Sequence, residues 1–396
     1  FYGSFTESLT DAFKYGSYTL GHRAGHPNLY VLTPDAISPD NCLYSIWLRS
    51  TAYKQIRETN QFLSLQRKYS EFSADRNKLW EAQVRFFRAF VYFQLAKRHG
   101  GVILYDDLPV STNKARSSAE ETWQFIADDL DFAANNLPKE WDAANKGRIT
   151  KGAAYALKSR AMLYAKRWQD AYDAANNVIA LKLYGLTDKY EDAWKGNNKE
   201  AILEFDYDAA NGPNHLFDRY YVPQCDGYDN GSTGTPTQEM VECYESKNGE
   251  KIDRSNSSQL AKGALPLKYG MDPDMKDGQS GIDVVIYRYA DVLLTLAECI
   301  NRNEGSPTTE AVGLVNRVRK RAGLPELDDA QTASGEAFNE AILLERGHEF
   351  YLEGLRRQDL IRFGKYVEYA NNRIDAINKS EGRGYFNVHE GHNRFW

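Results

Sequence analysis

Carboxylate and arginine side chains gather near the end of the sequence at spacings that could support acid–base chemistry. A pair of carboxylates is the usual general acid and base of glycoside hydrolysis. At separations of three or four residues, however, opposite charges also become neighbours on helices, where they form ion pairs that fix the packing. The same stretches carry the apolar spacing of core helices, so we interpret these charges as structural: Arg288, Asp291, Glu298, Glu345, Glu349, Glu353, Arg356, Arg357, Asp359 and Arg362.

The patterns expected of a metal site or a nucleophile are weak. His389 and His392 form an HxxH pair, but no carboxylate or thiolate cluster adjoins them, which favours a solvated tail. Four widely spaced cysteines form no CxxC pair and are interpreted as core residues or isolated thiols: Cys42, Cys225, Cys243 and Cys299. Their even number also permits one or two disulfides in an oxidising compartment, with no pairing fixed by the sequence. The sequence contains no GxSxG, HExxH, P-loop or GxGxxG motif. We therefore expect no catalytic activity, no metal and no cofactor.

Composition describes a globular protein that is not suited to nucleic acid. Of 396 residues, 42% are hydrophobic and 26% are charged, which is enough apolar material for a large core. The net charge of -6 opposes duplex binding, which depends on clustered Lys and Arg. No apolar run approaches the roughly 18 residues of a membrane-spanning helix. The sequence opens at Phe1 without Met, so any signal or lipid-attachment cysteine would lie upstream of it.

Helical periodicity dominates two long parts of the chain, approximately 42–205 and 282–370. From Leu79 to His99 apolar residues recur three and four apart, and the expected inward positions include Trp80, Val84 and Phe87. Serines at 117 and 118, three residues before glutamates, predict a capping box at the next helix. The helices expected at 151–166 and 171–178 resemble a tetratricopeptide unit. Similar pairs are predicted at 287–300 with 309–322, and at 338–354 with 357–369.

The middle of the chain, approximately 206–281, is different. Its helical period disappears and turn signals such as Asn211-Gly212-Pro213 and Asp229-Asn230-Gly231 become frequent. A loop region of this length inside a compact protein is usually functional. We predict one mainly α domain over 1–396: a scaffold of tetratricopeptide-like helical pairs with little β structure, whose loop-rich insertion, together with the turn-rich stretch 21–41, carries the binding surface.

Three ordered motifs in the C-terminal helices resemble the SusD/RagB family. The run from Ile286 to Glu298 is similar to that family's "hRhAdhhLhhAE" helix, in which h is apolar. Val315–Gly323 resembles its "hNxhRxRAG" motif, and Glu345–Gly364 resembles "ERxxEFxxEGxRxxDLxRfG". Earlier in the chain, Tyr53–Asn60, Ala82–Gly101, Gly147–Ala154 and Thr235–Tyr244 match further family patterns. The resemblance therefore spans nearly the whole chain.

The sequence departs from the family pattern in two places. An Asp-Pro-Arg segment expected after Tyr244 is replaced by a short passage, and a Pro-Ile-Pro strand expected after Trp396 is missing. We expect that residues of the full-length protein are absent between Asp253 and Gly281 and beyond the last residue.

The resemblance implies a non-catalytic protein that captures oligo- or polysaccharide. It further implies a lipoprotein on the outer membrane of a Gram-negative bacterium, working beside a SusC-type TonB-dependent transporter. Pyranose rings present apolar CH faces on which aromatic side chains stack, while amides and carboxylates bond the hydroxyl rims. Aromatic residues of the two turn-rich regions therefore become the candidate glycan-binding residues, with their polar neighbours: Asp40, Asn41, Trp47, Tyr220, Tyr221 and Tyr228.

Two other functions remain open. A helical-repeat adaptor would bind a protein partner in a concave groove, but it does not need the long insertion. A helical glycoside hydrolase would need two carboxylates in the loop-rich cleft. Carbohydrate capture is the favoured hypothesis.

Overall fold

The computed structural model describes residues 10–15, 51–106, 108, 113–208, 211–215, 234–250 and 280–380. Backbone contacts divide the chain into two compact units. Unit 1 comprises Phe1–Asn41, Leu186–Ile286 and Ser306–Trp396, and unit 2 comprises Cys42–Gly185 and Tyr287–Gly305. The sequence-based expectation of one domain stays a prediction.

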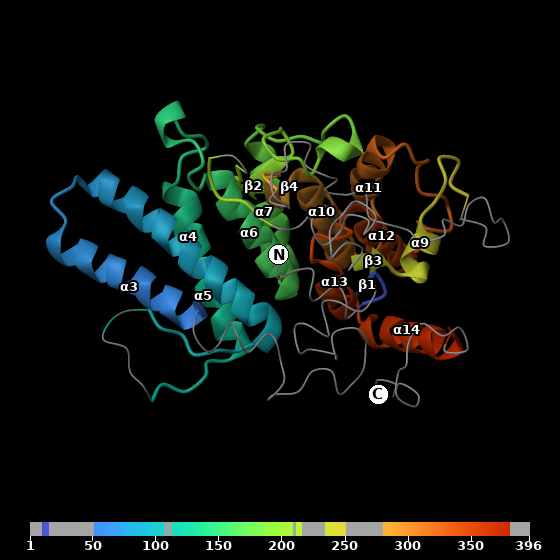
Figure 1. Cartoon of the computed structure of the whole chain (residues 1–396), viewed down its shortest axis with the longest axis horizontal. Coiled ribbons are helices and arrows are strands. Elements are labelled where there is room, and N and C mark those ends of the chain that lie inside the picture. The colour runs from blue at the N-terminus through green and yellow to red at the C-terminus, as the bar shows by residue number, and fades with distance from the viewer. Residues whose placement is uncertain are drawn as a thin grey trace. The chain divides into compact units, whose positions relative to one another are not determined.

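Unit 2 is a stack of helices in which each packs mainly on its neighbour in sequence (Figure 1). α3 packs on α4, α4 on α5, α5 on α6 and α6 on α7, and α10 covers α6 and α7. The bounds are α3 (Ala52–Tyr69), α4 (Ala74–His99), α5 (Ala119–Asn136), α6 (Lys151–Tyr164), α7 (Trp168–Ala180) and α10 (Tyr289–Glu304), with a 3-10 turn at Ala143–Asn145.

The capping box predicted before α5 is confirmed. The Ser118 hydroxyl accepts from the Glu121 backbone N–H at 3.1 Å, and the Glu121 carboxylate accepts from the Ser118 N–H at 2.7 Å. These two bonds satisfy donors that a helix start otherwise leaves open. α4 ends at Gly100, whose φ of +66° favours glycine.

One inward position predicted on α4 is wrong. Phe87 is 49% exposed, whereas Phe86 and Phe93 are buried. The buried face of α4 also includes Arg88, whose guanidinium bonds the carboxylate of Asp129 on α5 at 2.7 Å. A buried ion pair thus lies on the face of α4 where the spacing of apolar residues predicted the ring of Phe87.

The tetratricopeptide-like pair α6–α7 is confirmed by close packing of small residues. Ala153, Ala154, Ala161, Ala171 and Ala175 are buried at the crossing, which lets the two helices approach closely. The pairs expected further along are less regular. α10 packs on α6 and α7, whereas α11 contacts α12 in unit 1.

Unit 1 combines short strands with the C-terminal helices. It contains β1 (Phe13–Tyr15), β2 (Ala201–Phe205), β3 (Gly234–Pro236), α9 (Gln238–Cys243), β4 (Val284–Arg288), α11 (Thr309–Arg321), α12 (Gly335–Glu349), α13 (Arg356–Arg362), α14 (Tyr366–Ser380) and a 3-10 turn at Tyr190–Asp192. The strands form two separate ladders, β1 with β3 and β2 with β4. The unit boundary falls inside β4, which runs directly into α10.

Element boundaries in unit 1 differ from the predicted ones at four points. Tyr287 and Arg288 end a strand rather than begin a helix. α12 stops at Glu349 because Leu352 and Gly354 take positive φ values of 65° and 75°. Gly364, with φ of 72°, separates α13 from α14. α9 lies inside the region predicted to be loop, since six residues are too few for a helical period to show.

Candidate functional site

The first feature of the candidate site is the ladder that joins β1 to β3. The strands are antiparallel, with Phe13 opposite Pro236 and Tyr15 opposite Gly234. The chain therefore leaves β1 at the same end of the ladder at which it enters β3. The turn-rich stretch 21–41 follows β1, and the segment carrying Tyr220 and Tyr228 precedes β3. Both regions predicted to bind ligand thus start from one place, which we call the β1–β3 root.

Hydrogen bonds connect the β1–β3 root to the C-terminal helices. Thr237 donates its hydroxyl to the Asp11 carbonyl oxygen, and its N–H bonds the Ala12 carbonyl oxygen at 3.2 Å. The Asp11 carboxylate receives two bonds from Arg356 on α13, at 2.7 and 3.0 Å. Ala12, Asp11 and Arg356 are all buried. A bidentate arginine pair fixes orientation as well as distance, so the root is held rigidly.

A second anchor closes the loop-rich segment near β2 and β4. The backbone groups of His215 and Ser280 bond each other in both directions, at 2.7 and 3.1 Å. The His215 imidazole Nε2 bonds the Ile282 carbonyl oxygen at 2.8 Å, and its ring meets the Tyr207 ring edge to face with centroids 4.8 Å apart. These bonds hold His215 and Ser280 side by side, and we call this place, with the adjoining residues after β2 and before β4, the neck.

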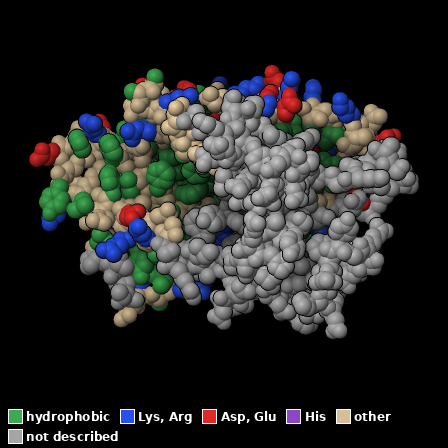
Figure 2. Space-filling model, viewed as in Figure 1, with side chains coloured by type: hydrophobic (Ala, Val, Ile, Leu, Met, Phe, Trp, Pro, Cys, Tyr) green, Lys and Arg blue, Asp and Glu red, His purple; other side chains and the backbone are tan. Residues whose placement is uncertain are grey.

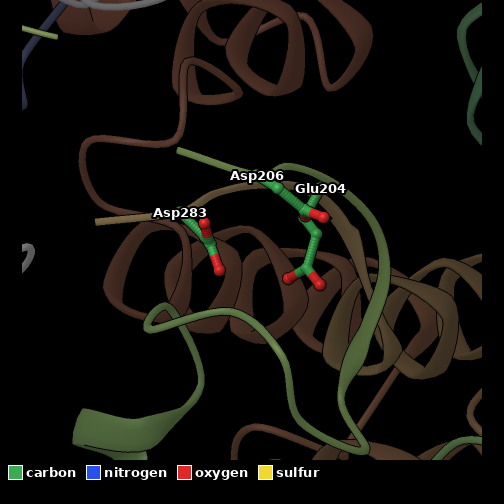
Figure 3. A group of neighbouring side chains, drawn as sticks. All are labelled: Glu204, Asp206 and Asp283. Carbon is green, nitrogen blue, oxygen red and sulfur yellow. The ribbon is translucent and has the colours of Figure 1, made fainter. Parts of the chain in front are cut away.

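Three carboxylates meet beside this neck, from Glu204, Asp206 and Asp283 (Figure 3). One oxygen of each lies within 4.8 Å of the others. The backbone N–H groups of Asn197 and Tyr207 bond Glu204 at 2.9 Å and Asp283 at 2.8 Å. Carboxylate oxygens are the ligands that Ca²⁺ prefers, so this is the group of described residues that could hold a cation. The backbone donors already offset part of its charge.

Sequence reasoning missed these neck residues. Phe205 is 52% exposed, and Tyr207 and His215 are half-buried. The available signal was the alternation Phe205-Asp206-Tyr207-Asp208, which sets aromatic rings beside carboxylates. That combination suits a sugar ring. The candidate residues chosen from sequence all lie outside the described residues and stay predictions: Asp40, Asn41, Trp47, Tyr220, Tyr221 and Tyr228. His389 and His392 lie outside them too.

The structural interpretation of the clustered charges is confirmed where they form ion pairs, as do Asp291, Glu298, Glu345, Glu349, Arg356, Asp359 and Arg362. On α12 and α13, Asp359 is bonded by Arg346 and Arg362, each at 2.8 Å, and all three side chains are buried. Burial raises the pKa of Asp359, but the two guanidinium groups outweigh it and hold that pKa below the usual value. In unit 2, Asp291 pairs with Arg160 at 2.8 Å. These carboxylates are held in buried ion pairs.

A buried network of shared arginines surrounds Glu345. Arg319 bonds Glu345 at 3.1 Å and Glu245, after α9, at 2.8 Å. The carboxylates of Glu345 and Glu245 therefore share the Arg319 guanidinium. The Glu349 carboxylate lies close enough to repel the charged form of Glu345. Burial raises the pKa of Glu345 to about 7, with Arg319 opposing the shift. Burial lowers the pKa of the neighbouring His348 to about 4, so that the imidazole is neutral and stacks on Tyr244.

Two of the four cysteines lie in the described residues, and neither forms a disulfide there. Cys299 is buried in α10 and Cys243 is half-buried at the end of α9. Burial raises the pKa of the Cys243 thiol to about 12, which makes it unreactive. Both agree with the sequence-based interpretation as isolated thiols. A search of the described helices for one long and apolar enough to cross a bilayer finds none.

Family models match both halves of the chain. One described as "SusD family" covers residues 261–390, and one described as "Starch-binding associating with outer membrane" covers residues 17–163. A SusD-like protein from Bacteroides ovatus is 27% identical over 385 residues, 78% of this chain and 65% of that protein. The starch-binding protein SusD of Bacteroides thetaiotaomicron is 39% identical over 102 residues, 26% of this chain and 15% of that protein.

A solved structure agrees with these matches. The crystal structure of a SusD-like protein from Bacteroides fragilis has a TM-score of 0.74 at 25% identity, covering 93% of this chain and 84% of that chain. The mainly helical fold predicted from sequence is confirmed by this likeness. The chain spans about 65% of the length of the first curated relatives that it matches.

Proposed function

The chain belongs to the SusD/RagB family, and on that premise we propose that it captures an oligo- or polysaccharide at the surface of a Gram-negative bacterium. It binds the glycan without cleaving it and passes it to a SusC-type TonB-dependent transporter. Attachment to the outer membrane is through a lipid on a cysteine upstream of Phe1.

The observation that carries the proposal is the common origin of the two turn-rich regions at the β1–β3 root. Aromatic side chains that are far apart in the sequence can then converge on one ligand. We propose that these side chains form an open platform for a long chain. The neck has the exposed ring of Phe205 and three carboxylates, which are also suited to sugar faces and hydroxyl rims.

A helical hydrolase is the competing function because the trio of Glu204, Asp206 and Asp283 brings carboxylates within 4.8 Å of one another. Retaining glycosidases hold their two carboxyl groups about 5 to 5.5 Å apart. The two functions predict different outcomes for Glu204→Gln. In a hydrolase it removes turnover, whereas in a capture protein there is no turnover to remove.

Affinity electrophoresis in gels that contain different polysaccharides tests glycan capture directly. The protein should be retarded by at least one polysaccharide, with a dissociation constant in the micromolar to millimolar range for two or three stacking contacts of about 1 kcal/mol each. Trp47→Ala, or Tyr220→Ala with Tyr221→Ala, should weaken retention several-fold. Tyr69→Ala is the matched control, because this tyrosine is 64% exposed on α3. Equal retention of all variants would remove the proposed site.

Unit 2 offers a surface for the transporter partner. Four large apolar side chains of α3, α4 and the turn between them are 48 to 64% exposed: Leu65, Tyr69, Phe72 and Phe87. Figure 2 shows hydrophobic side chains exposed over this part of the molecule. Apolar groups gathered on a surface mark a protein contact. Joint purification of the tagged transporter with wild-type protein, but not with the variant Tyr69→Ser/Phe72→Ser, supports this assignment. Recovery of another protein in its place favours the adaptor function.

A further inference from the structure

A polar pocket of about 660 Å³ opens between α11 and the chain that follows it. One wall is a single face of the helix, made of Thr309, Val312, Gly313, Asn316, Arg317 and Lys320 at spacings of three and four. The opposite wall is the segment from Glu326 to Thr332. Sites for small ligands commonly measure about 300–1,000 Å³, so this space accepts one or two sugar rings.

Hydrogen bonds fix the two walls against each other. The Asn316 side-chain oxygen accepts from the Leu327 N–H at 2.9 Å, which ties the segment to the helix. The Thr332 hydroxyl donates to the Asp328 carbonyl oxygen at 3.0 Å. Nothing lies within 4 Å of the position that a side chain on Gly313 would take. The pocket is therefore open above the backbone of Gly313.

The lining offers both donors and acceptors for hydroxyl groups. Because the Asn316 oxygen is already engaged, its Nδ2 donors remain for a ligand. Lys320 and Glu326 line the pocket without an ion pair between them or to any other described residue. Arg317 is a further positively charged side chain in the lining. Pro307 and Val312 provide apolar surface for ring CH groups.

We propose that this pocket binds a sugar that carries a carboxylate, such as a hexuronic acid. Lys320 pairs with the carboxylate, while Asn316 and Glu326 bond the ring hydroxyls. A bare phosphate is disfavoured by the Glu326 carboxylate, and a neutral sugar leaves Lys320 without an anion. The site is separate from the β1–β3 root, so it stands whichever glycan the loops bind.

Titration calorimetry with galacturonic acid, its dimer and the methyl ester of the dimer tests the proposal. The dimer should bind the wild-type protein, and the ester should bind about 3- to 10-fold more weakly because the charged hydrogen bond is lost. Better binding of the dimer than of the free acid identifies a polysaccharide as the source. Lys320→Ala should weaken the dimer by a similar factor, whereas Lys247→Ala, an exposed lysine outside the pocket, should not.

Gly313→Leu adds a side chain to the pocket, its Cβ meets nothing within 4 Å, and leucine favours a helix, so it should abolish uronate binding while the protein melts normally. Its retention in polysaccharide gels should equal that of wild type if the loops bind glycan independently. Failure of the wild-type protein to bind any of the three acidic or esterified ligands overturns the proposal. Undiminished uronate binding by Gly313→Leu would also overturn the proposal. Loss of gel retention in Trp47→Ala alone would test only the proposed glycan site in the loops.

Discussion

Arg356 shows at the scale of one residue how a charge can be buried without catalysis. Its guanidinium bonds both Asp11 oxygens and the Leu343 carbonyl oxygen of α12. Passage beneath α12 is possible because residue 347 is glycine. A side-chain carbon there would lie 2.8 Å from Arg356 Nη1. The motif Glu345–Gly364 therefore supplies both Arg356 and the glycine that leaves space for its side chain.

Arg356→Ala should destabilise the protein by about 3 to 5 kcal/mol, because it leaves the buried Asp11 carboxylate without its partner. Urea denaturation measures this difference. Lys54→Ala, which breaks an exposed pair on α3, should change stability by less than about 1 kcal/mol. A stable Arg356→Ala protein that only loses glycan would contradict the structural role. Glu353 is only half-buried, so Glu353→Ala should cost less than Arg356→Ala.

Glu345 should make stability depend on pH. Its pKa in the folded protein is about 7, above the ordinary value of 4.5, so between these values the folded protein holds a proton that the unfolded chain has released. The contribution of Glu345 to the free energy of unfolding is therefore fully present below pH 4.5 and is lost as the pH rises to about 7. Urea midpoints at pH 5, 6, 7 and 8 should fall more steeply for wild type than for Glu345→Gln. Glu310→Gln, an exposed change on α11, should retain the wild-type slope, and equal slopes for wild type and Glu345→Gln would contradict the assignment.

At the scale of elements, the root depends on a short helix that could not form alone. α9 has six residues, yet the Thr237 hydroxyl accepts from the Met240 N–H at 3.1 Å and also donates to the Asp11 carbonyl oxygen. The same hydroxyl thus starts a helix and holds a strand. Met240 and Trp194 then bury the helix in a small core. Tertiary contacts, not helix length, stabilise this element.

Thr237→Val keeps the shape and removes the hydroxyl, so it should loosen the root at a cost of about 1 to 3 kcal/mol. Hydrogen exchange should accelerate at the Thr237 amide, which bonds the Ala12 carbonyl oxygen. Ser118→Ala removes a cap in unit 2 at a cost of about 1 kcal/mol and should leave that amide protected. Unchanged exchange in Thr237→Val would show that the root is held by other contacts.

The helices of unit 2 could be predicted from sequence because their signals are local. Ser118 and Glu121 identify a start, and the alanines of α6 and α7 identify a crossing. The root could not be predicted, because Thr237 and Asp11 are 226 residues apart and no local pattern joins them. For the same reason the acidic trio at the neck was missed, since Asp283 reaches Glu204 only through the pairing of β2 with β4.

At the scale of the whole molecule, the proposed function predicts that glycan is retained without turnover. Incubation with any polysaccharide that the protein retains should release no reducing ends above a protein-free control, and Glu204→Gln should behave in the same way. Colorimetric assay of reducing ends over a day is sufficient. Release by wild type that is abolished in Glu204→Gln would establish a hydrolase and reverse the proposed function.

The ion pair between Asp11 and Arg356 also affects the order in which parts of the protein can fold. Its partners are 345 residues apart, so the N-terminal strand emerges from the ribosome long before the arginine that will hold it exists. Helices such as α4 to α7 close through neighbouring contacts and can form as they are synthesised, whereas β1 must wait for almost the entire chain. The β1–β3 root, from which the proposed glycan surface starts, is consequently among the last parts of the molecule to be completed, and a chain cut short before Arg356 lacks the ion pair that holds it.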